Sequence, residues 1–147
     1  MSYPQHSSEM TSHPEIAEMR ERLERTASSS PAILIEGLIL LAGVYAAISP
    51  WVVHFSSQPN LAVNNLIVGI TVGLIGLGLT TAPESMIRLA WVVAPLGVWL
   101  LISPWVVTAT HSAGAGIIWN NVWVGAVTAV LGLGAMGLTV GVRRTRR

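Results

Sequence analysis

The sequence contains no cysteine, no lysine and no aspartate, and only 10% of its 147 residues carry a formal charge. The absence of cysteine excludes a disulfide framework and a thiolate-ligated metal site. Soluble domains carry roughly 25% charged residues, so the shortage of charge argues against an ordinary soluble domain. A net charge of +1 points to no nucleic-acid partner.

Long apolar stretches take the place of the missing charge. Residues 37–83 and 89–142 contain no charged side chain. They belong to four apolar segments, at about 32–55, 61–82, 87–108 and 117–142. Each segment has about 20 residues or more, enough to cross a hydrocarbon core of roughly 30 Å. A water-soluble helical core would need polar outer faces, which these segments lack. The sequence therefore predicts an all-α polytopic membrane protein with four transmembrane helices.

All eight basic residues are arginines, and they predict how the chain is oriented. In a four-span layout they fall on one side of the membrane: in the N-terminal arm, at Arg88 and in the C-terminal tail. The connecting loops on the other side carry none. The positive-inside rule therefore predicts that both termini are cytoplasmic.

Residues 1–31 are polar and form a predicted cytoplasmic arm without the apolar core of a secretory signal. Ser12 and Glu15 have the spacing of a capping box, which predicts an amphipathic helix at about residues 13–26. Its narrow apolar stripe is formed by Ile16, Met19 and Leu23. This helix either binds a membrane surface or a partner, or is a solvated tether.

The apolar region contains an internal duplication. Residues 43–53 (GVYAAISPWVV) align with residues 97–107 (GVWLLISPWVV) at an offset of 54. Residues 64–69 (NNLIVG) then align with residues 120–125 (NNVWVG) at an offset of 56. Two such collinear blocks predict two tandem helix hairpins. Because each hairpin has an even number of spans, a pseudo-two-fold axis along the membrane normal should relate them.

The duplication resembles the SPW-repeat family of small bacterial membrane proteins, named for a Ser-Pro-Trp motif in the first helix of a two-helix unit. The motif occurs here twice, as Ser49-Pro50-Trp51 and as Ser103-Pro104-Trp105. The resemblance divides the chain into repeat 1 (32–82), repeat 2 (87–142) and a basic tail (143–147). It implies a bacterial inner-membrane protein and names no reaction.

Each Ser-Pro-Trp motif has two interpretations. The proline lacks an N–H and crowds the carbonyl four residues earlier, which predicts a kink in the helix. The preceding serine can help to satisfy the backbone groups that the kink leaves without a hydrogen bond. The tryptophan then anchors the helix at headgroup level. In this interpretation the motif is structural. In the other, the two kinks shape a pocket for a lipid or a quinone.

Two asparagine pairs and three pairs of small residues recur in the second helices of the hairpins. Asn64, Asn65, Asn120 and Asn121 are predicted to cap helices or to make polar contacts between them, with a polar ligand site as the alternative. Small residues four apart allow close helix packing. These pairs are Gly69 with Gly73, Gly125 with Ala129, and Gly137 with Gly141. They could pack repeat on repeat or protomer on protomer.

Three titratable residues near the spans are possible ligands. His54 and His111 lie in the two loops opposite the arginines and could ligate haem or a metal ion. They are not a duplicated pair, because His54 aligns with Thr108. Glu36 is either a functional intramembrane acid or an interfacial carboxylate that reaches water or Arg88. No metal site and no catalytic cluster is predicted.

These features favour a non-enzymatic scaffold or accessory subunit that packs with other membrane proteins or with itself. One alternative is an outer-face binding protein for quinone, haem or lipid in a redox process, and another is an oligomeric transporter or channel. No cofactor is required except in the redox alternative. Anionic lipids are expected to bind the basic tail through Arg143, Arg144, Arg146 and Arg147.

Overall fold

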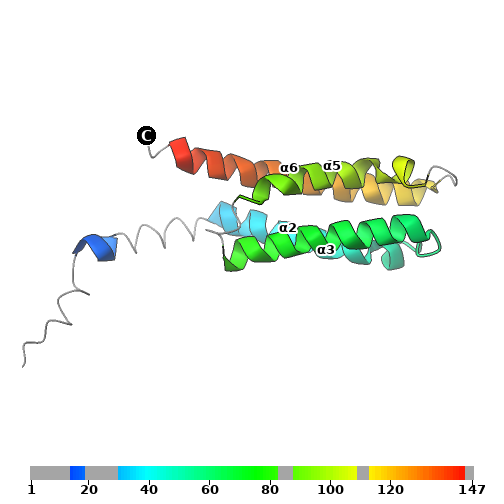
Figure 1. The fold of residues 1–147 in the computed structure, drawn as a ribbon, viewed down its shortest axis with the longest axis horizontal. Coiled ribbons are helices and arrows are strands. Elements are labelled where there is room, and N and C mark those ends of the chain that lie inside the picture. Colours follow the sequence, from blue (N-terminus) through cyan, green and yellow to red (C-terminus); the bar gives the residue numbers. More distant parts are fainter. Residues whose placement is uncertain (1–13, 19–29, 83–87, 109–112, 145–147) are drawn as a thin grey trace, which may run out of the picture. The chain divides into compact units, whose positions relative to one another are not determined.

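A computed structural model describes residues 14–18, 30–82, 88–108 and 113–144, the last range with side chains to residue 138 (Figure 1). Every element within these ranges is helical. The chain divides into two units, residues 1–33 and 34–147. In the first unit residues 14–18 are helical, and the rest of the helix predicted at 13–26 lies outside the described residues.

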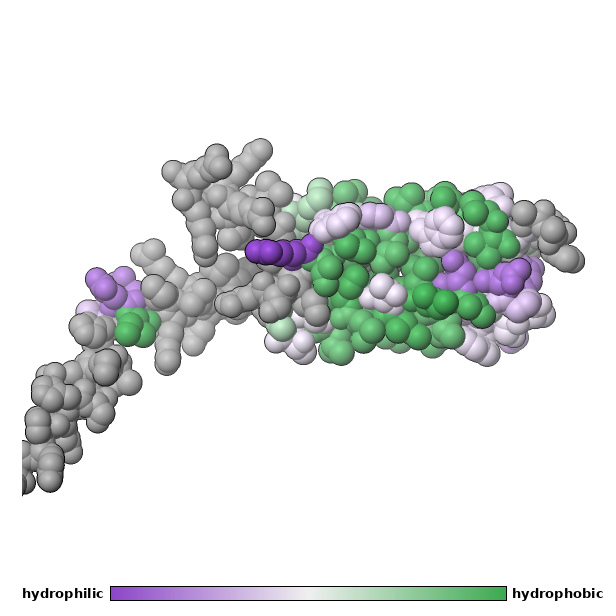
Figure 2. Space-filling view, viewed as in Figure 1, coloured by the Kyte–Doolittle hydropathy of each residue, from purple (hydrophilic) through white to green (hydrophobic). Residues whose placement is uncertain are grey.

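The second unit is a bundle of four helices. They are α2 (Ser30–Val52, whose first turn belongs to the first unit), α3 (Pro59–Thr81), α5 (Ala90–Val106) and α6 (Ala115–Arg144). Among the described residues three helices are long and apolar enough to cross a membrane, over Pro31–Val52, Pro59–Thr81 and Ala115–Leu138. The fourth, α5, is apolar but has only 17 residues. In Figure 2, hydrophobic side chains cover the middle of the bundle and hydrophilic ones gather toward its ends.

The helices α2 and α3 form hairpin 1, and they touch through their backbones. A Cβ added at Gly43 would lie 2.2 Å from the backbone nitrogen of Gly73. A Cβ added at Gly69 would lie 2.3 Å from the backbone nitrogen of Ala47. Neither distance is compatible with a side chain, so only glycine at these positions allows the two helices to approach so closely.

Hairpin 2, formed by α5 and α6, repeats this crossing. A Cβ added at Gly97 would lie 2.2 Å from the nitrogen of Ala129, and one added at Gly125 would lie 2.4 Å from the nitrogen of Leu101. Gly97 aligns with Gly43, and Gly125 aligns with Gly69. The two hairpins therefore pack their helices at equivalent points.

The first helix of each hairpin ends soon after its proline, at Val52 and at Val106. The predicted spans continued to about Phe55 and Thr108. After α2 the chain adopts a Schellman turn, in which His54 has a positive φ of 60° and the N–H of Phe55 donates to the carbonyl of Pro50 over 2.9 Å. After α5 the hydroxyl of Thr108 donates to the carbonyl of Pro104, and Ala109, the residue aligned with Phe55, lies outside the described residues.

The two hairpins pack through α3 against α5, and through α2 against α6, where Ile35 lies beside Gly134. Their shared apolar core includes Ile39, Val72, Val93 and Leu100, all fully buried. We call the end of the bundle that carries both Ser-Pro-Trp motifs the Ser-Pro-Trp end. At this end the core gives way to buried polar side chains.

Candidate functional site: a buried polar layer between the hairpins

In both Ser-Pro-Trp motifs the serine repairs the hydrogen bond that the proline removes. Because Pro50 has no N–H, the carbonyl of Ala46 lacks its usual helical donor. The hydroxyl of Ser49 donates to that carbonyl over 2.9 Å. In hairpin 2 the hydroxyl of Ser103 donates to the carbonyl of Leu100 over 2.8 Å. This pairing explains why serine directly precedes proline in each motif.

The two motif serines face a pair of asparagines at the centre of the bundle. The side-chain amide of Asn65 donates to Ser49 Oγ over 3.2 Å and to Asn121 Oδ1 over 2.8 Å. Asn121 Oδ1 also lies 3.5 Å from Ser103 Oγ. All four side chains are buried. The Asn65–Asn121 bond joins hairpin 1 to hairpin 2, and a buried bond of this kind fixes how two apolar surfaces are aligned.

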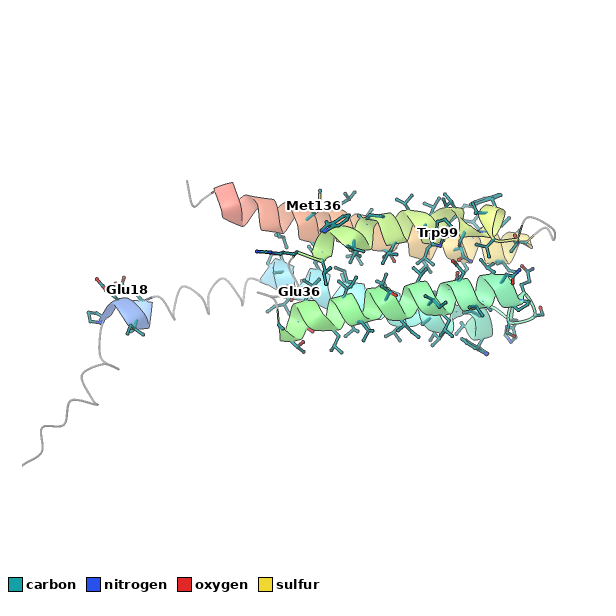
Figure 3. The ribbon with its side chains drawn as sticks, in the orientation of Figure 1. Glu18, Glu36, Trp99 and Met136 are labelled. Carbon is teal, nitrogen blue, oxygen red and sulfur yellow. The ribbon has the colours of Figure 1, made fainter. Side chains whose placement is uncertain are left out.

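Two further hydrogen bonds flank the central pair, and each crosses between the hairpins. Tyr45 on α2 donates its hydroxyl to Asn120 Oδ1 over 2.9 Å. Trp99 on α5, labelled in Figure 3, donates Nε1–H to Asn64 Oδ1 over 2.8 Å. Tyr45 aligns with Trp99 in the repeat, and Asn64 aligns with Asn120. Such a reciprocal exchange is what a two-fold axis between the hairpins produces.

The asparagine pairs of α3 and α6 thus make polar contacts between the helices of the bundle. They do not cap these helices, which corrects one of the two roles predicted for them. Helix α3 begins at Pro59 with Gln58 as its N-cap, well before Asn64. Helix α6 begins at Ala115, also ahead of its pair. Each pair lies more than one turn inside its helix, because the apolar sequence before it continues the helix.

Tyr45 and Trp99 were not recognised from the sequence as part of this site. A signal was present, however. These two residues occupy the same repeat position, and both are aromatic side chains with a single hydrogen-bond donor. A change of residue type that keeps a donor indicates that the donor is used.

The tryptophans of the motifs point away from the polar layer. Trp51 is 56% exposed and Trp105 is 55% exposed, whereas the serine and proline of each motif are buried. The space between the two motifs is filled by Asn65 and Asn121. Each motif therefore presents a polar and packed side to the bundle and an indole to its surroundings.

The predicted small-residue pairs fall into two groups. Gly69 and Gly125 lie at the crossing points within hairpins, opposite Ala47 and Leu101. Their contacts are inside each repeat, an arrangement that was not among those considered from the sequence. Gly137 differs, because a Cβ added there would meet no atom within 4 Å in the part of the chain that the structure describes. The surroundings of Gly141 lie outside the part of the chain that the structure describes.

The possible ligand residues are not brought together. His54 is exposed in the turn after α2, while Glu36 is partly buried near the start of the same helix, about 27 Å away along its axis (Figure 3). His111 lies outside the described residues. Among those residues no group of three or more histidine, cysteine or acidic side chains could hold a metal ion.

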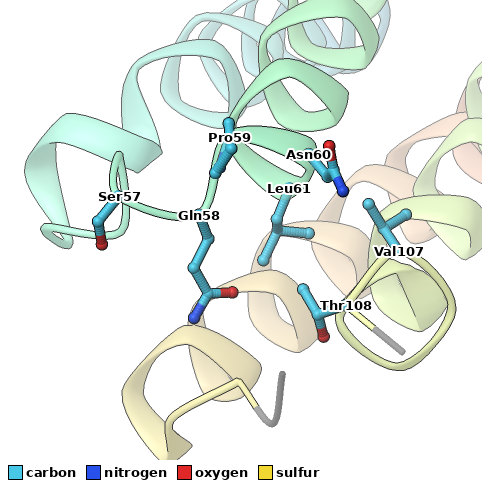
Figure 4. Close-up of a pocket in the computed structure, with 7 residues that line it drawn as sticks. All are labelled: Ser57, Gln58, Pro59, Asn60, Leu61, Val107 and Thr108. Carbon is cyan, nitrogen blue, oxygen red and sulfur yellow. The ribbon is translucent and has the colours of Figure 1, made fainter. Parts of the chain in front are cut away.

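A cleft of about 230 Å³ opens at the Ser-Pro-Trp end (Figure 4). One wall is the loop before α3 and the first turn of α3, and the other is the end of α5 at Val107 and Thr108. Gln58, which lines the first wall, has a buried side-chain oxygen with no hydrogen-bond partner among the described residues. No prediction from the sequence concerned this residue.

Comparison with known protein families identifies part of the chain. Residues 33–135 match the SPW repeat domain, a stretch that contains both Ser-Pro-Trp motifs and both asparagine pairs. No curated protein and no solved structure matches the chain.

Proposed function

Because the chain belongs to the SPW repeat family, we propose that it is a non-enzymatic scaffold or accessory subunit that associates in the membrane with itself or with another membrane protein. The family and the apolar helices make it a multi-pass membrane protein. The finer assignment is our proposal, and it rests on how the glycines of the bundle are used.

We infer four spans, with the N-terminal arm and the C-terminal tail on the cytoplasmic side of an inner membrane. The 17 residues of α5 reach about 26 Å, a little short of a typical hydrocarbon core. Local thinning of the bilayer accommodates a mismatch of this size at modest cost. The arginine distribution supports the orientation.

A single observation carries the scaffold proposal: a Cβ added at Gly137 would meet none of the residues that the structure describes. Gly43, Gly69, Gly97 and Gly125 each allow a backbone contact inside a hairpin. Gly137 makes no such backbone contact with the described residues. Because glycine destabilises a helix by roughly 0.5–1 kcal/mol relative to alanine, its presence there suggests a contact with another molecule. It also precedes Gly141 at the spacing that favours close helix association.

Gly137 continues an outward face of α6. Residues at helical spacing before it are among the most exposed in the protein: Trp119 (62%), Trp123 (64%), Val130 (66%) and Leu133 (55%). This α6 face combines large side chains at one end with glycine at the other. It can seat a second helix whose own side chains fit over the glycines.

The test compares two glycine substitutions in the full chain, expressed in its native membrane and extracted in mild detergent. We expect the wild-type protein to run as a complex, either with itself or with a co-purifying protein. Gly137→Leu should weaken that complex at least about tenfold, by blocking the approach of a partner helix.

Gly37→Leu is the matched control. Gly37 also has open space around it, but Leu41 follows it four residues later, so it belongs to no small-residue pair. This variant should leave the complex unchanged. A wild-type protein that runs as a lone monomer, or an equal loss in both variants, would contradict the proposal.

A further inference from the structure

The cleft at the Ser-Pro-Trp end lies between the two hairpins and is separate from the buried polar layer. Its first wall comes from hairpin 1, through Ser57, Gln58 and Asn60, and its second comes from hairpin 2. In Figure 4 the side chain of Gln58 extends along the cleft toward the wall that carries Thr108. The described residues leave the cleft partly open, so a group that does not belong to them can enter it.

Gln58 Oε1 is the chemical feature that calls for an occupant. This oxygen is buried and has no donor among the described residues. Buried acceptors in native proteins are almost always paired, and an unpaired one is unfavourable. An occupant that fits this cleft must therefore bring an N–H or O–H donor to Gln58.

The size and lining of the cleft narrow the occupant further. At about 230 Å³ it is smaller than the roughly 300–1,000 Å³ of sites that hold drug-sized ligands. Quinone oxygens and ionised haem carboxylates only accept hydrogen bonds, so neither can satisfy Gln58. The lining contains amide and hydroxyl groups together with Leu61 and Val107, and no charged side chain. This chemistry suits a small polar group attached to an apolar chain.

We propose that the cleft binds the headgroup of a phospholipid whose terminal group donates a hydrogen bond to Gln58 Oε1. Suitable groups are the ammonium of phosphatidylethanolamine and the hydroxyls of phosphatidylglycerol. The exposed indoles of Trp51 and Trp105 lie at the same end of the bundle, and tryptophan concentrates at headgroup depth. The site depends on membrane insertion and is independent of association through the α6 face.

The position of the cleft also provides for the phosphate. The first turn of α3 forms part of the wall. Because Pro59 has no N–H, the N–H groups of this turn that have no acceptor within the helix are those of Asn60 and Leu61. Such groups bind phosphate readily. A lipid with its phosphate at this turn and its terminal donor at Gln58 uses both features at once.

The test uses the full chain in nanodiscs that contain equal amounts of phosphatidylethanolamine, phosphatidylglycerol and phosphatidylcholine with identical acyl chains. After detergent washing, native mass spectrometry identifies the lipid that stays bound. Phosphatidylcholine is the control, because its quaternary ammonium has no N–H. We expect a lipid with a donor to be retained roughly 2- to 10-fold over phosphatidylcholine, the factor that one net hydrogen bond supplies.

Two variants of one residue separate the acceptor from the shape of the cleft. Gln58→Met keeps the length of the side chain but removes the acceptor, and should abolish the preference. Gln58→Glu keeps an acceptor and adds a negative charge, and should shift the preference toward phosphatidylethanolamine. Circular dichroism of both variants establishes that the helices are retained.

Three outcomes would overturn the proposal. One is equal retention of all three lipids by the wild-type protein, which would mean that the cleft holds water alone. Another is a preference that survives Gln58→Met while Gln58→Glu has no effect. The third is binding of free ethanolamine or glycerol to lipid-free protein with displacement of any retained lipid, which would identify a soluble occupant. None of these results depends on whether the protein forms a complex.

Discussion

In hairpin 1 the carbonyl of the motif proline accepts a backbone N–H, from Phe55, whereas in hairpin 2 it accepts the side-chain hydroxyl of Thr108. The first solution requires a left-handed residue, His54, and the second does not. Among the residues that the structure describes, the two repeats therefore end their first helices with different contacts. Deeper in the bundle they are alike: Gly43 and Gly97 make the same contact, as do Gly69 and Gly125.

The comparison shows where the duplicated sequence is free to change. At a helix crossing the two backbones are so close that no side chain fits, and no alternative residue can make the same contact. At a helix end, a freed carbonyl can be satisfied by a backbone group, a hydroxyl or water. The interior contacts therefore stay the same in both repeats, while the loops differ in length and in hydrogen bonding.

The largest expected effect comes from filling the helix crossings. Gly69→Ala and Gly125→Ala each place a Cβ about 2.3 or 2.4 Å from a backbone nitrogen of the facing helix. Because backbone cannot move aside cheaply, each variant should lose about 3 kcal/mol of stability. Unfolding in bicelles should show similar losses in both repeats, whereas Gly137→Ala should gain about 0.5–1 kcal/mol. A loss in only one repeat would break the equivalence of the two crossings.

An intermediate effect is expected at the central amide pair. Asn65→Leu and Asn121→Leu each leave the other asparagine buried without its partner, which costs about 1–3 kcal/mol. The double variant removes both polar groups and should lose much less than the sum of the single losses. A double-mutant cycle in the same unfolding assay measures this coupling. Simple additivity would show that the two amides do not act as a pair.

The smallest expected effect has opposite signs in the two repeats. His54→Gly removes the cost of a left-handed non-glycine residue, about 1 kcal/mol, and should stabilise the protein by up to that amount. The aligned change Thr108→Gly removes the hydroxyl that satisfies Pro104 and should destabilise it by a similar amount. Thermal unfolding of both variants checks the signs. Stabilisation by Thr108→Gly would mean that the two helix ends are closed in the same way.

Much of the fold follows from the sequence because two signals are strong. The uncharged stretches predict apolar helices, and the Ser-Pro-Trp and Asn-Asn blocks predict a duplication. Both copies of each block lie within the stretch that matches the SPW repeat domain. The ends of α2 and α5 were less predictable. An apolar pattern continues through Val53 and Val107 and does not mark where either helix stops. In hairpin 1 the end is set by the left-handed turn at His54.

The partners of the site residues were harder to predict than the residues themselves. The spacing of Gly69 and Gly73 shows that some helix approaches closely, but the rotation of α3 about its axis decides which one. The bonds from Tyr45 to Asn120 and from Trp99 to Asn64 join different repeats. Sequence alignment pairs Tyr45 with Trp99 as equivalents and contains no information on which groups meet across the axis.

The central amide pair has a consequence for how such a protein could arise. Two identical hairpins related by a strict dyad would place the same amide on both sides, so a single hydrogen bond between them could run in either direction. An ancestral pair of separate hairpins joined by one such bond would thus have had two arrangements of equal energy. Joining the copies in one polypeptide lifts that degeneracy, since Asn65 gives and Asn121 receives. Each half can then specialise for its own side of the bond.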